Sequence, residues 1–569
     1  MYENGSIYMG ITKELQPQKV MFDMSQANRH GLIAGASGTG KTITMKVMAE
    51  SFSDAGVPVF VCDVKGDVSG LAEPGEDNEG MQKRIDRFGI RDTFSYKSYP
   101  VTFWDIYGKG GHPIRTTVSD FGPELLSQIM GLSEIQEGVL NIAFRVADDN
   151  GLKILDLKDL RAVLNHISDN RVKYSAKYGN IASASINSIT RAILPLEDQG
   201  GNEFFGEPAL DINDWFMRSD DGRGMINVLH AVEVIQKPKL YCMFLMWMLA
   251  ELFEQLPEAG DADKPKFVFF FDEAHLLFKD VPKAFLQLIE QTVKLIRSKG
   301  VGIYFVTQSP SDIPDPVLAQ LSNRVQHALR AYTPAEQKAV RTAAQTFRVN
   351  PDFKTEDAIM NLGTGEALTS FLDAKGVPQI VQYTKIICPQ SLMAPCSSAT
   401  KAQCMAGSLM GEKYDEPIDN ISAYEILTEQ AEIDAEIAAD ELALKQAEKE
   451  AAEQAKQEEK ERIAAEKAAA KEEERQRIAE EKEAFRQKIA EEKEAQRLKL
   501  AAEKEELRQK IAAEKLAQKE KEKAEKKAEE ERKKKEKQKA QRQAKIESQF
   551  IQAGGQVLKR GLLGILKLK

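Results

Sequence analysis

Residues 31–65 read GLIAGASGTGKTITMKVMAESFSDAGVPVFVCDVK, and this stretch decides the fold because it contains a phosphate-binding loop. Glycines let such a loop curl so that its N–H groups point at phosphate oxygens, and the following helix adds its positive N-terminal end. Lys41 would reach the β- and γ-phosphates, and the Thr42 hydroxyl would ligate Mg²⁺. The sequence therefore predicts a site for ATP and Mg²⁺. The loop fits the pattern G-x-x-x-x-G-K-[ST] and consists of Gly35, Ala36, Ser37, Gly38, Thr39, Gly40, Lys41 and Thr42.

The residues around this loop predict alternating strands and helices. The apolar run 32–34 is typical of a strand, and 42–52 is typical of a helix. The β-branched run 57–62 predicts a buried parallel strand. Asp63 and Lys65 follow at the polar end of this strand. This end lies at the carboxyl edge of the sheet, where ligands bind in open α/β folds. The expected fold class is α/β, with a mainly parallel sheet flanked by helices.

A further apolar strand carries two adjacent carboxylates at its end. Residues 267–271 are Phe-Val-Phe-Phe-Phe, and Asp272 and Glu273 follow directly. Asp272 would hold the Mg²⁺ shell through water, and Glu273 would align and polarise the attacking water. Another strand, 301–307, ends before Gln308, which we interpret as a sensor of the γ-phosphate or of the water. The alternative is that the two acids are present only because acidic residues are favourable at a helix N-terminus. The phosphate-binding loop upstream makes this alternative weaker.

Three arginines are candidates for an arginine finger. Arg297 precedes the strand 301–307, whereas Arg324 and Arg330 belong to the segment 323–330. A finger stabilises the charge of the reacting phosphate, and one that is given to a neighbour's site requires an oligomer. Each arginine could instead form a surface ion pair, and this alternative stays open.

Composition limits the partners and the compartment. The 569 residues include 78 Lys and Arg against 88 Asp and Glu, a net charge of −10. Such a chain cannot hold nucleic acid through its overall charge, so any contact with DNA must be local. The start shows no secretory signal, the most apolar run (240–252) suits a buried core helix, and the five cysteines form no C-x-x-C pair. We expect a cytoplasmic protein, with the inner membrane surface as a peripheral location reached through the tail.

The chain divides by pattern into five segments. Helical periodicity at 124–130, 134–148, 157–167 and 181–194 interrupts the α/β alternation, which resumes with a strand at 224–230. Residues 364–387 predict a closing hairpin. The predicted segments are a first part of the ATPase core (1–112), a helical insertion (113–220), a second part of the core (221–425), a long charged helix or coiled coil (426–549) and a basic amphipathic tail (550–569).

The tail is built almost entirely from strong helix formers and predicts one long helix. An 11-residue repeat favours a nearly straight or slightly right-handed coiled coil. Its apolar seam is thin, so a self-associating coiled coil and a lone solvated helix both stay open. Residues 550–569 interleave apolar and basic side chains and could lie on a membrane, dock on a protein partner, rest on DNA phosphates or simply fray. The repeat begins at Arg475, Arg486, Arg497 and Arg508.

Five segments together resemble the HerA/FtsK branch of P-loop ATPases, and the best match is a bacterial HerA-like family of unknown function. The resemblance implies a RecA-like core, a hexameric ring and ATP-driven DNA translocation. It also implies nucleotide, metal and water roles for Lys41, Thr42, Asp272, Glu273 and Gln308, with Arg297 or Arg324 as the finger. One departure is that HerA opens with a β-barrel domain, whereas about thirty residues precede the loop here. The segments are NRHGLIAGASGTGKT (28–42), DVKGD (63–67), FFFDEAH (269–275), TQSPSDIP (307–314) and NRVQHALR (323–330).

Two functions from different classes follow as hypotheses. The first is an ATP-hydrolysing motor, a ring-forming DNA translocase or helicase-like enzyme. The second is an ATP-dependent assembly or scaffold protein that its C-terminal helix tethers to a membrane or to a protein partner. The acidic core and the amphipathic end motivate the second hypothesis. A GTPase is disfavoured because the sequence has no N-K-x-D segment to recognise guanine.

Overall fold

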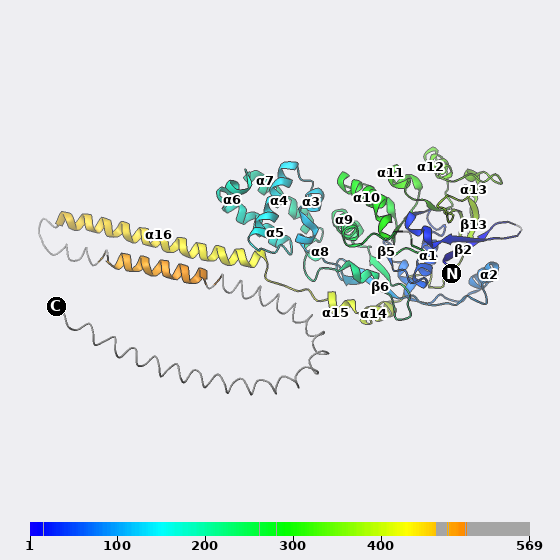
Figure 1. Ribbon diagram of the computed structural model, residues 1–569, viewed down its shortest axis with the longest axis horizontal. Helices are drawn as coiled ribbons and strands as arrows, with labels where there is room; N and C mark the ends of the chain where they lie inside the picture. The colour runs from blue at the N-terminus through cyan, green and yellow to red at the C-terminus, as the bar shows by residue number, and fades with distance from the viewer. Residues whose placement is uncertain are drawn as a thin grey trace, which may run out of the picture. The chain divides into compact units, whose positions relative to one another are not determined.

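The computed structural model describes residues 1–14, 16–260, 262–279, 281–461, 475, 477–495 and 497 (Figure 1). The chain forms two compact units, Met1–Glu432 and Ile433–Lys569. The first unit contains the sheet and its covering helices. The described part of the second unit is helical.

A 13-stranded sheet organises the first unit in the order β1-β2-β13-β12-β11-β4-β10-β9-β5-β8-β6-β7, with β3 paired to β2. The strands from β11 to β7 in this order run parallel, and those from β1 to β12 pair antiparallel. This arrangement confirms the predicted α/β class. The strands are β1 Tyr2–Glu3, β2 Ser6–Thr12, β3 Lys19–Asp23, β4 Gly31–Ala34, β5 Val59–Asp63, β6 Val101–Asp105, β7 His112–Pro113, β8 Ile226–His230, β9 Phe267–Phe271, β10 Val301–Thr307, β11 Asn323–His327, β12 Glu366–Ser370 and β13 Gln382–Ile386.

Alternate residues of the parallel strands enter two different apolar cores. Phe269 and Phe271 of β9 point into a core shared with α9 (Pro238–Gln255) and α10 (Lys283–Leu295). Val268 and Phe270 point into a core covered by α1 (Lys41–Asp54) and the β2–β3 hairpin. Both faces of the sheet are therefore buried, which explains the continuous apolar runs in the sequence. Polar side chains are left to gather where the strands end.

A block of helices lies between β7 and β8 in the sequence. The helices expected at 134–148, 157–167 and 181–194 are confirmed as α4, α5 and α7, whereas α6 was not predicted. Figure 1 shows the block gathered together, and α3 contacts both α9 and α10. The block shares one apolar core with the sheet, so it packs onto the sheet within the first unit. Its members are α3 Val118–Met130, α4 Glu134–Asp149, α5 Leu157–Asp169, α6 Arg171–Tyr178, α7 Ser183–Glu197 and α8 Gly201–Phe204.

Among the remaining helices of this unit, α1 and α9 match helices expected from the sequence, whereas α2 and α11 to α15 were not predicted. The apolar run 240–252 lies in the buried helix α9, and β12 and β13 form the expected closing hairpin. In the described part of the chain, no helix is both long and apolar enough to cross a membrane. The other helices are α1 Lys41–Asp54, α2 Glu79–Phe88, α9 Pro238–Gln255, α10 Lys283–Leu295, α11 Asp315–Leu318, α12 Pro334–Gln345, α13 Thr355–Asn361, α14 Ser398–Ala406 and α15 Met410–Tyr414.

A charged helix begins where the sequence predicts one and is α16, Ala423–Glu461, but it is not the single long helix that was expected over 426–549. A second helical stretch covers 477–495, and Lys493 Nζ lies 3.3 Å from Glu436 Oε2. An unbroken helix would separate these two residues by about 85 Å, so 477–495 lies beside α16 and does not continue it. The repeats from residue 498 onward and the amphipathic segment 550–569 lie outside the described residues.

Candidate nucleotide-binding site

The predicted phosphate-binding loop connects β4 to α1. Gly35 has a φ of 155°, and its N–H donates to the Thr307 carbonyl 3.2 Å away. A Cβ at this position would lie 2.5 Å from the Cβ of His327, so the loop requires glycine here. Ser37 and Gly38, at the tip of the loop, are exposed. The loop is thus fixed at its base and open at its tip, which suits the binding of a phosphate chain.

Lys41 begins α1 and directs its ammonium back onto the loop. Its Nζ donates to the carbonyls of Gly35 at 2.7 Å and Ala36 at 3.1 Å. Burial lowers the pKa of Lys41, and the negative charges of Glu273 and Asp272 act in the opposite direction. Among the described residues, no side chain caps the N-terminus of α1, so its first N–H groups are available to an anion.

A buried histidine supports the loop from the neighbouring strand β11. His327 Nδ1 lies 3.0 Å from the Glu366 carbonyl, and Nε2 lies 2.8 Å from Thr44 Oγ1 in α1. Because the carbonyl only accepts, Nδ1 donates to it and Nε2 accepts from the Thr44 hydroxyl. Burial lowers the pKa of His327 to about 4, so the ring is neutral at pH 7. His327 therefore ties α1 to the antiparallel part of the sheet without placing a charge under the loop.

The two acidic residues after β9 lie in unusual surroundings. Asp272 is 2% exposed, and burial raises its pKa to about 7. Within the described part of the chain, Asp272 Oδ2 has no hydrogen-bond partner. Glu273 has a left-handed backbone with a φ of 48°, a conformation that costs a non-glycine residue energy and that occurs often at functional sites. A buried acceptor without a donor and a strained backbone therefore occupy consecutive positions.

Side chains from three different segments surround the Glu273 carboxylate. Lys65 forms an ion pair with Oε1. Gln308 Nε2 lies 3.5 Å from Oε2, and His275 Nδ1 lies 3.2 Å from the same oxygen. Burial acts to raise the pKa of Glu273, but the hydrogen bond and the charge of Lys65 outweigh it, and the pKa lies below its ordinary value. Glu273 is therefore ionised and held in place.

The strand order explains why these residues meet. Strand β10 pairs with β4 on one side and with β9 on the other. Gln308 directly follows β10, so it lies between the phosphate-binding loop and the acidic pair. Because all three strands run parallel, their carboxyl ends share one edge of the sheet, which is where ligands bind in such folds.

The donors at this edge fit a nucleotide that carries Mg²⁺. The unpaired Asp272 Oδ2 is a carboxylate oxygen, the type of ligand that Mg²⁺ prefers. Thr42 is half-buried in the first turn of α1 and is the second predicted ligand. Mg²⁺ usually takes one or two protein ligands and completes its shell with phosphate oxygens and water. Thr42 and Asp272 can supply such a set.

The predicted arginine fingers differ in how the chain holds them. Arg324, in β11, donates to the backbone carbonyls of Leu318, Leu321 and Thr346. To reach a neighbouring subunit it would have to break these three bonds, so it is better explained as a brace between α11, β11 and the end of α12. Arg297 lies in the exposed turn before β10 and stays the predicted finger.

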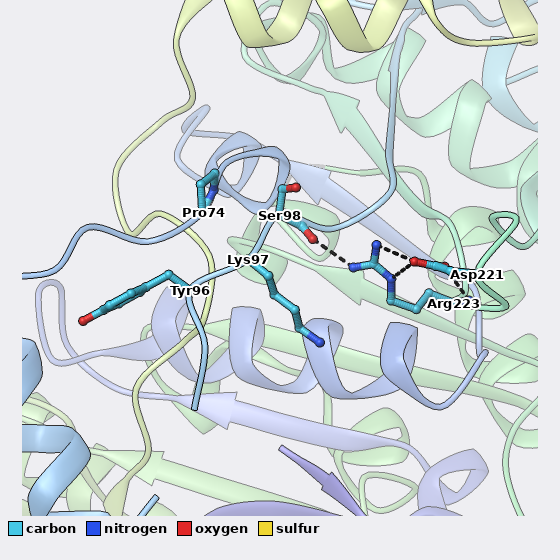
Figure 2. A pocket seen from close by; sticks show the side chains of 6 residues that line it. All are labelled: Pro74, Tyr96, Lys97, Ser98, Asp221 and Arg223. Atoms are coloured by element: carbon cyan, nitrogen blue, oxygen red, sulfur yellow. Dashed lines mark hydrogen bonds and ion pairs between the residues drawn. The ribbon is translucent and has the colours of Figure 1, made fainter. Parts of the chain in front are cut away.

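A separate cleft of about 590 Å³ is lined by Pro74, Tyr96, Lys97, Ser98, Asp221 and Arg223. Figure 2 shows the Arg223 guanidinium bonded to Asp221 and to the carbonyl of Ser98. Lys97 is paired with Asp54 at 2.7 Å. Because both cations of the cleft are neutralised by carboxylates of the chain itself, the cleft offers an anion little attraction.

The family model described as "Helicase HerA-like C-terminal" matches residues 9–491, which is most of the chain. The chain belongs to this family. The HerA-like assignment agrees with the P-loop site and with the motifs that carried the resemblance, and it makes the chain a P-loop NTPase.

Among curated proteins, the DNA double-strand break repair helicase HerA of Sulfolobus acidocaldarius is 21% identical over 372 residues. The match covers 62% of this HerA-like chain and 64% of the relative, so the chain spans less than two thirds of the relative's length. Among solved structures, the unbound bacterial conjugative coupling protein TrwB matches with 14% identity, 67% and 89% coverage and a TM-score of 0.45. VirB4 of Thermoanaerobacter pseudethanolicus matches with 15% identity, 68% and 97% coverage and a TM-score of 0.41. The family assignment rests on the family model and not on these structures.

The HerA-like site contains two residues to which the sequence analysis gave no role. Lys65 was noted only as a polar residue at a strand end, and His327 only as part of a motif. A lysine two residues after the end of one strand, with acids directly after another strand, is a signal that could have paired Lys65 with Glu273. His327 gives no such signal, because its partners become visible only once β11 and α1 are placed in space.

Proposed function

We propose that this HerA-like chain hydrolyses ATP with Mg²⁺ and uses the energy as a motor. The observation that carries the proposal is the convergence of Lys41, Asp272, Glu273 and Gln308 at one edge of the sheet. These side chains come from the ends of three adjacent parallel strands. They include a phosphate-binding cation, a candidate metal ligand and an ionised carboxylate, which is what phosphoryl transfer to water requires.

Each residue has a defined part in the proposed reaction. The loop N–H groups and Lys41 would bind the phosphates, while Thr42 and Asp272 would hold Mg²⁺. Bound Mg²⁺ would neutralise charge on the transferring phosphoryl group. Glu273 would accept a hydrogen bond from the attacking water and orient it, and Gln308 would contact the same water or the γ-phosphate.

We further propose that the motor acts on DNA as a ring, with Arg297 completing the neighbouring subunit's site. Family membership and the printed function of the relative, a DNA double-strand break repair helicase, support this proposal. The exposed position of Arg297 is compatible with a finger given to another subunit. A hexamer is the expected ring.

The second candidate is an ATP-dependent scaffold that the tail tethers to a protein partner or to a membrane surface. The helix α16 favours it, because its apolar side chains Ile437 and Leu442 are 42% and 58% exposed. Apolar side chains at such positions are available to a partner helix. In this reading the protein is cytoplasmic or peripheral at the inner membrane surface.

Steady-state ATP hydrolysis by the full-length protein, with and without double-stranded DNA, separates the two candidates. The Glu273→Gln variant serves as the blank. Several-fold stimulation by DNA supports the translocase. A high rate of hydrolysis that DNA does not change, together with no DNA binding, contradicts the translocase and favours the scaffold. Absence of hydrolysis by the unaltered protein contradicts both.

A further inference from the structure

Lys65 is directed at the carboxylate that the proposed reaction needs most. Its ammonium pairs with Glu273 Oε1, while Gln308 and His275 lie near Oε2. The Glu273 side chain is 7% exposed, whereas that of Lys65 is 45% exposed. The lysine thus reaches from the solvent side to one oxygen of a nearly buried carboxylate, and the other oxygen is left facing the side where Gln308 lies.

The loop that carries Lys65 is built to hold it there. Asp63, at the end of β5, accepts backbone N–H bonds from Lys65 at 3.2 Å, Gly66 at 2.7 Å and Val68 at 3.1 Å. Gly66 has a φ of 84°, which a side-chain-bearing residue would adopt only with strain. The loop therefore has a fixed conformation over the residues on either side of Lys65.

A second lysine anchors the far end of the same loop. Lys46, fully buried in α1, donates to the Asp67 carbonyl at 3.2 Å and to the Leu392 carbonyl at 2.5 Å. The helix that begins at the phosphate-binding loop therefore also fixes the loop after β5. An exposed lysine that met a carboxylate by chance would not need its backbone secured from both sides.

We propose that Lys65 is a positioning residue: it holds Glu273 in the orientation in which the carboxylate can position the water that attacks the nucleotide. The inference rests on the proposed ATPase function. Lys65 binds Oε1 and so fixes the rotation of the carboxylate, which leaves Oε2 to meet water beside Gln308. Without Lys65, the glutamate would lose its strongest partner and sample orientations in which Oε2 no longer faces the water.

The test compares Lys65→Met and Lys65→Arg in the full-length protein, each alone and combined with Glu273→Gln. Lys19→Met is the matched control, because Lys19 is similarly exposed and pairs with a glutamate, Glu3, far from the site in the sheet. We expect Lys65→Met to lower kcat roughly 10- to 100-fold with less than about a threefold change in the dissociation constant of a fluorescent ATP analogue. Lys65→Arg should restore most of the kcat, and Lys19→Met should leave it unchanged.

The double variants decide whether Lys65 acts through Glu273. In the Glu273→Gln background, Lys65→Met should change single-turnover hydrolysis by less than about threefold, because the oriented group is already absent. Effects that multiply, or a loss of nucleotide affinity as large as the loss of kcat, would overturn the inference and make Lys65 a phosphate ligand. Full activity of Lys65→Met beside an active wild type would overturn the inference alone. A wild type without ATP turnover would overturn the proposed function and the inference with it.

Discussion

The ends of β5 and β9 are neighbours in the sheet, and each presents an aspartate, yet the two aspartates are treated differently. Asp63 uses both carboxylate oxygens to accept three N–H groups of its own loop. Asp272 Oδ2 has no partner among the described residues, and the next residue, Glu273, has a left-handed backbone. Both oxygens of Asp63 therefore have donors from the chain itself, whereas Oδ2 of Asp272 is available to a ligand.

This difference indicates that the two aspartates have different roles at the same edge of the sheet. A carboxylate that accepts three backbone N–H groups through both oxygens shapes a loop, and it has little left for a ligand. A buried carboxylate oxygen without a donor is costly unless something else, such as a metal ion, compensates it. We therefore treat Asp63 as a scaffold residue and the end of β9, with Asp272 and Glu273, as the reactive side. Replacing Asp63 should affect stability first, and replacing Asp272 or Glu273 should affect turnover.

The largest expected effect comes from Lys41→Ala, which removes the cation that the reactive side requires. ATP binding should weaken roughly 10- to 100-fold, because hydrogen bonds to a charged group are lost, and turnover should fall to background. Titration with a fluorescent ATP analogue and steady-state hydrolysis measure the two quantities. Unchanged affinity would break the assignment of the loop as the phosphate site.

The variants Asp272→Asn and Asp63→Asn test directly whether the two aspartates have different roles. Asp272→Asn should abolish Mg²⁺-dependent turnover while changing the free energy of unfolding by less than about 1 kcal/mol, because Oδ2 has no donor to lose. Asp63→Asn should cost about 1–3 kcal/mol at pH 8, because an amide cannot accept all three N–H bonds.

Urea unfolding of the nucleotide-free variants, followed by hydrolysis assays on those that remain folded, measures this pair. If Asp63→Asn were stable but inactive, or Asp272→Asn strongly destabilised, the division between scaffold and reactive side would be wrong.

A smaller effect concerns His327, a scaffold residue under the loop. Burial lowers its pKa to about 4, so between pH 6.5 and pH 4 the unfolded chain binds a proton that the folded chain rejects. The free energy of unfolding should therefore fall as the pH drops through this window, by about 3 kcal/mol or less from this residue. His30, whose pKa is also lowered to about 4 by burial, adds to the same trend.

Urea unfolding of the wild type and of His327→Gln at several pH values between 7.5 and 4.5 measures this slope. The variant should be less stable at pH 7.5 and should lose part of the pH dependence. An identical slope in both proteins would mean that His327 does not titrate in this window.

The sequence was sufficient wherever the signal is local. The phosphate-binding loop, the apolar strands and the polar residues after them can be predicted from short patterns, since spacing and strand propensity act within a few residues. The contacts of Lys65 with Glu273 and of His327 with Thr44 could not, because they join residues 208 and 283 positions apart and depend on strand order. The helix expected at 124–130 forms the part of α3 that follows a kink at Gly122, whose φ is 78°, and only the helical turn before this kink, from Val118, was not predicted.

The central claim is that the end of β9 performs the chemistry, and the most direct test is the turnover of Glu273→Gln measured beside its ATP affinity. Glutamine keeps the shape of the side chain but cannot accept a proton. We expect kcat to fall by about 10²- to 10⁴-fold while the dissociation constant for ATP stays within about threefold of the wild type. Normal hydrolysis by Glu273→Gln would contradict the account.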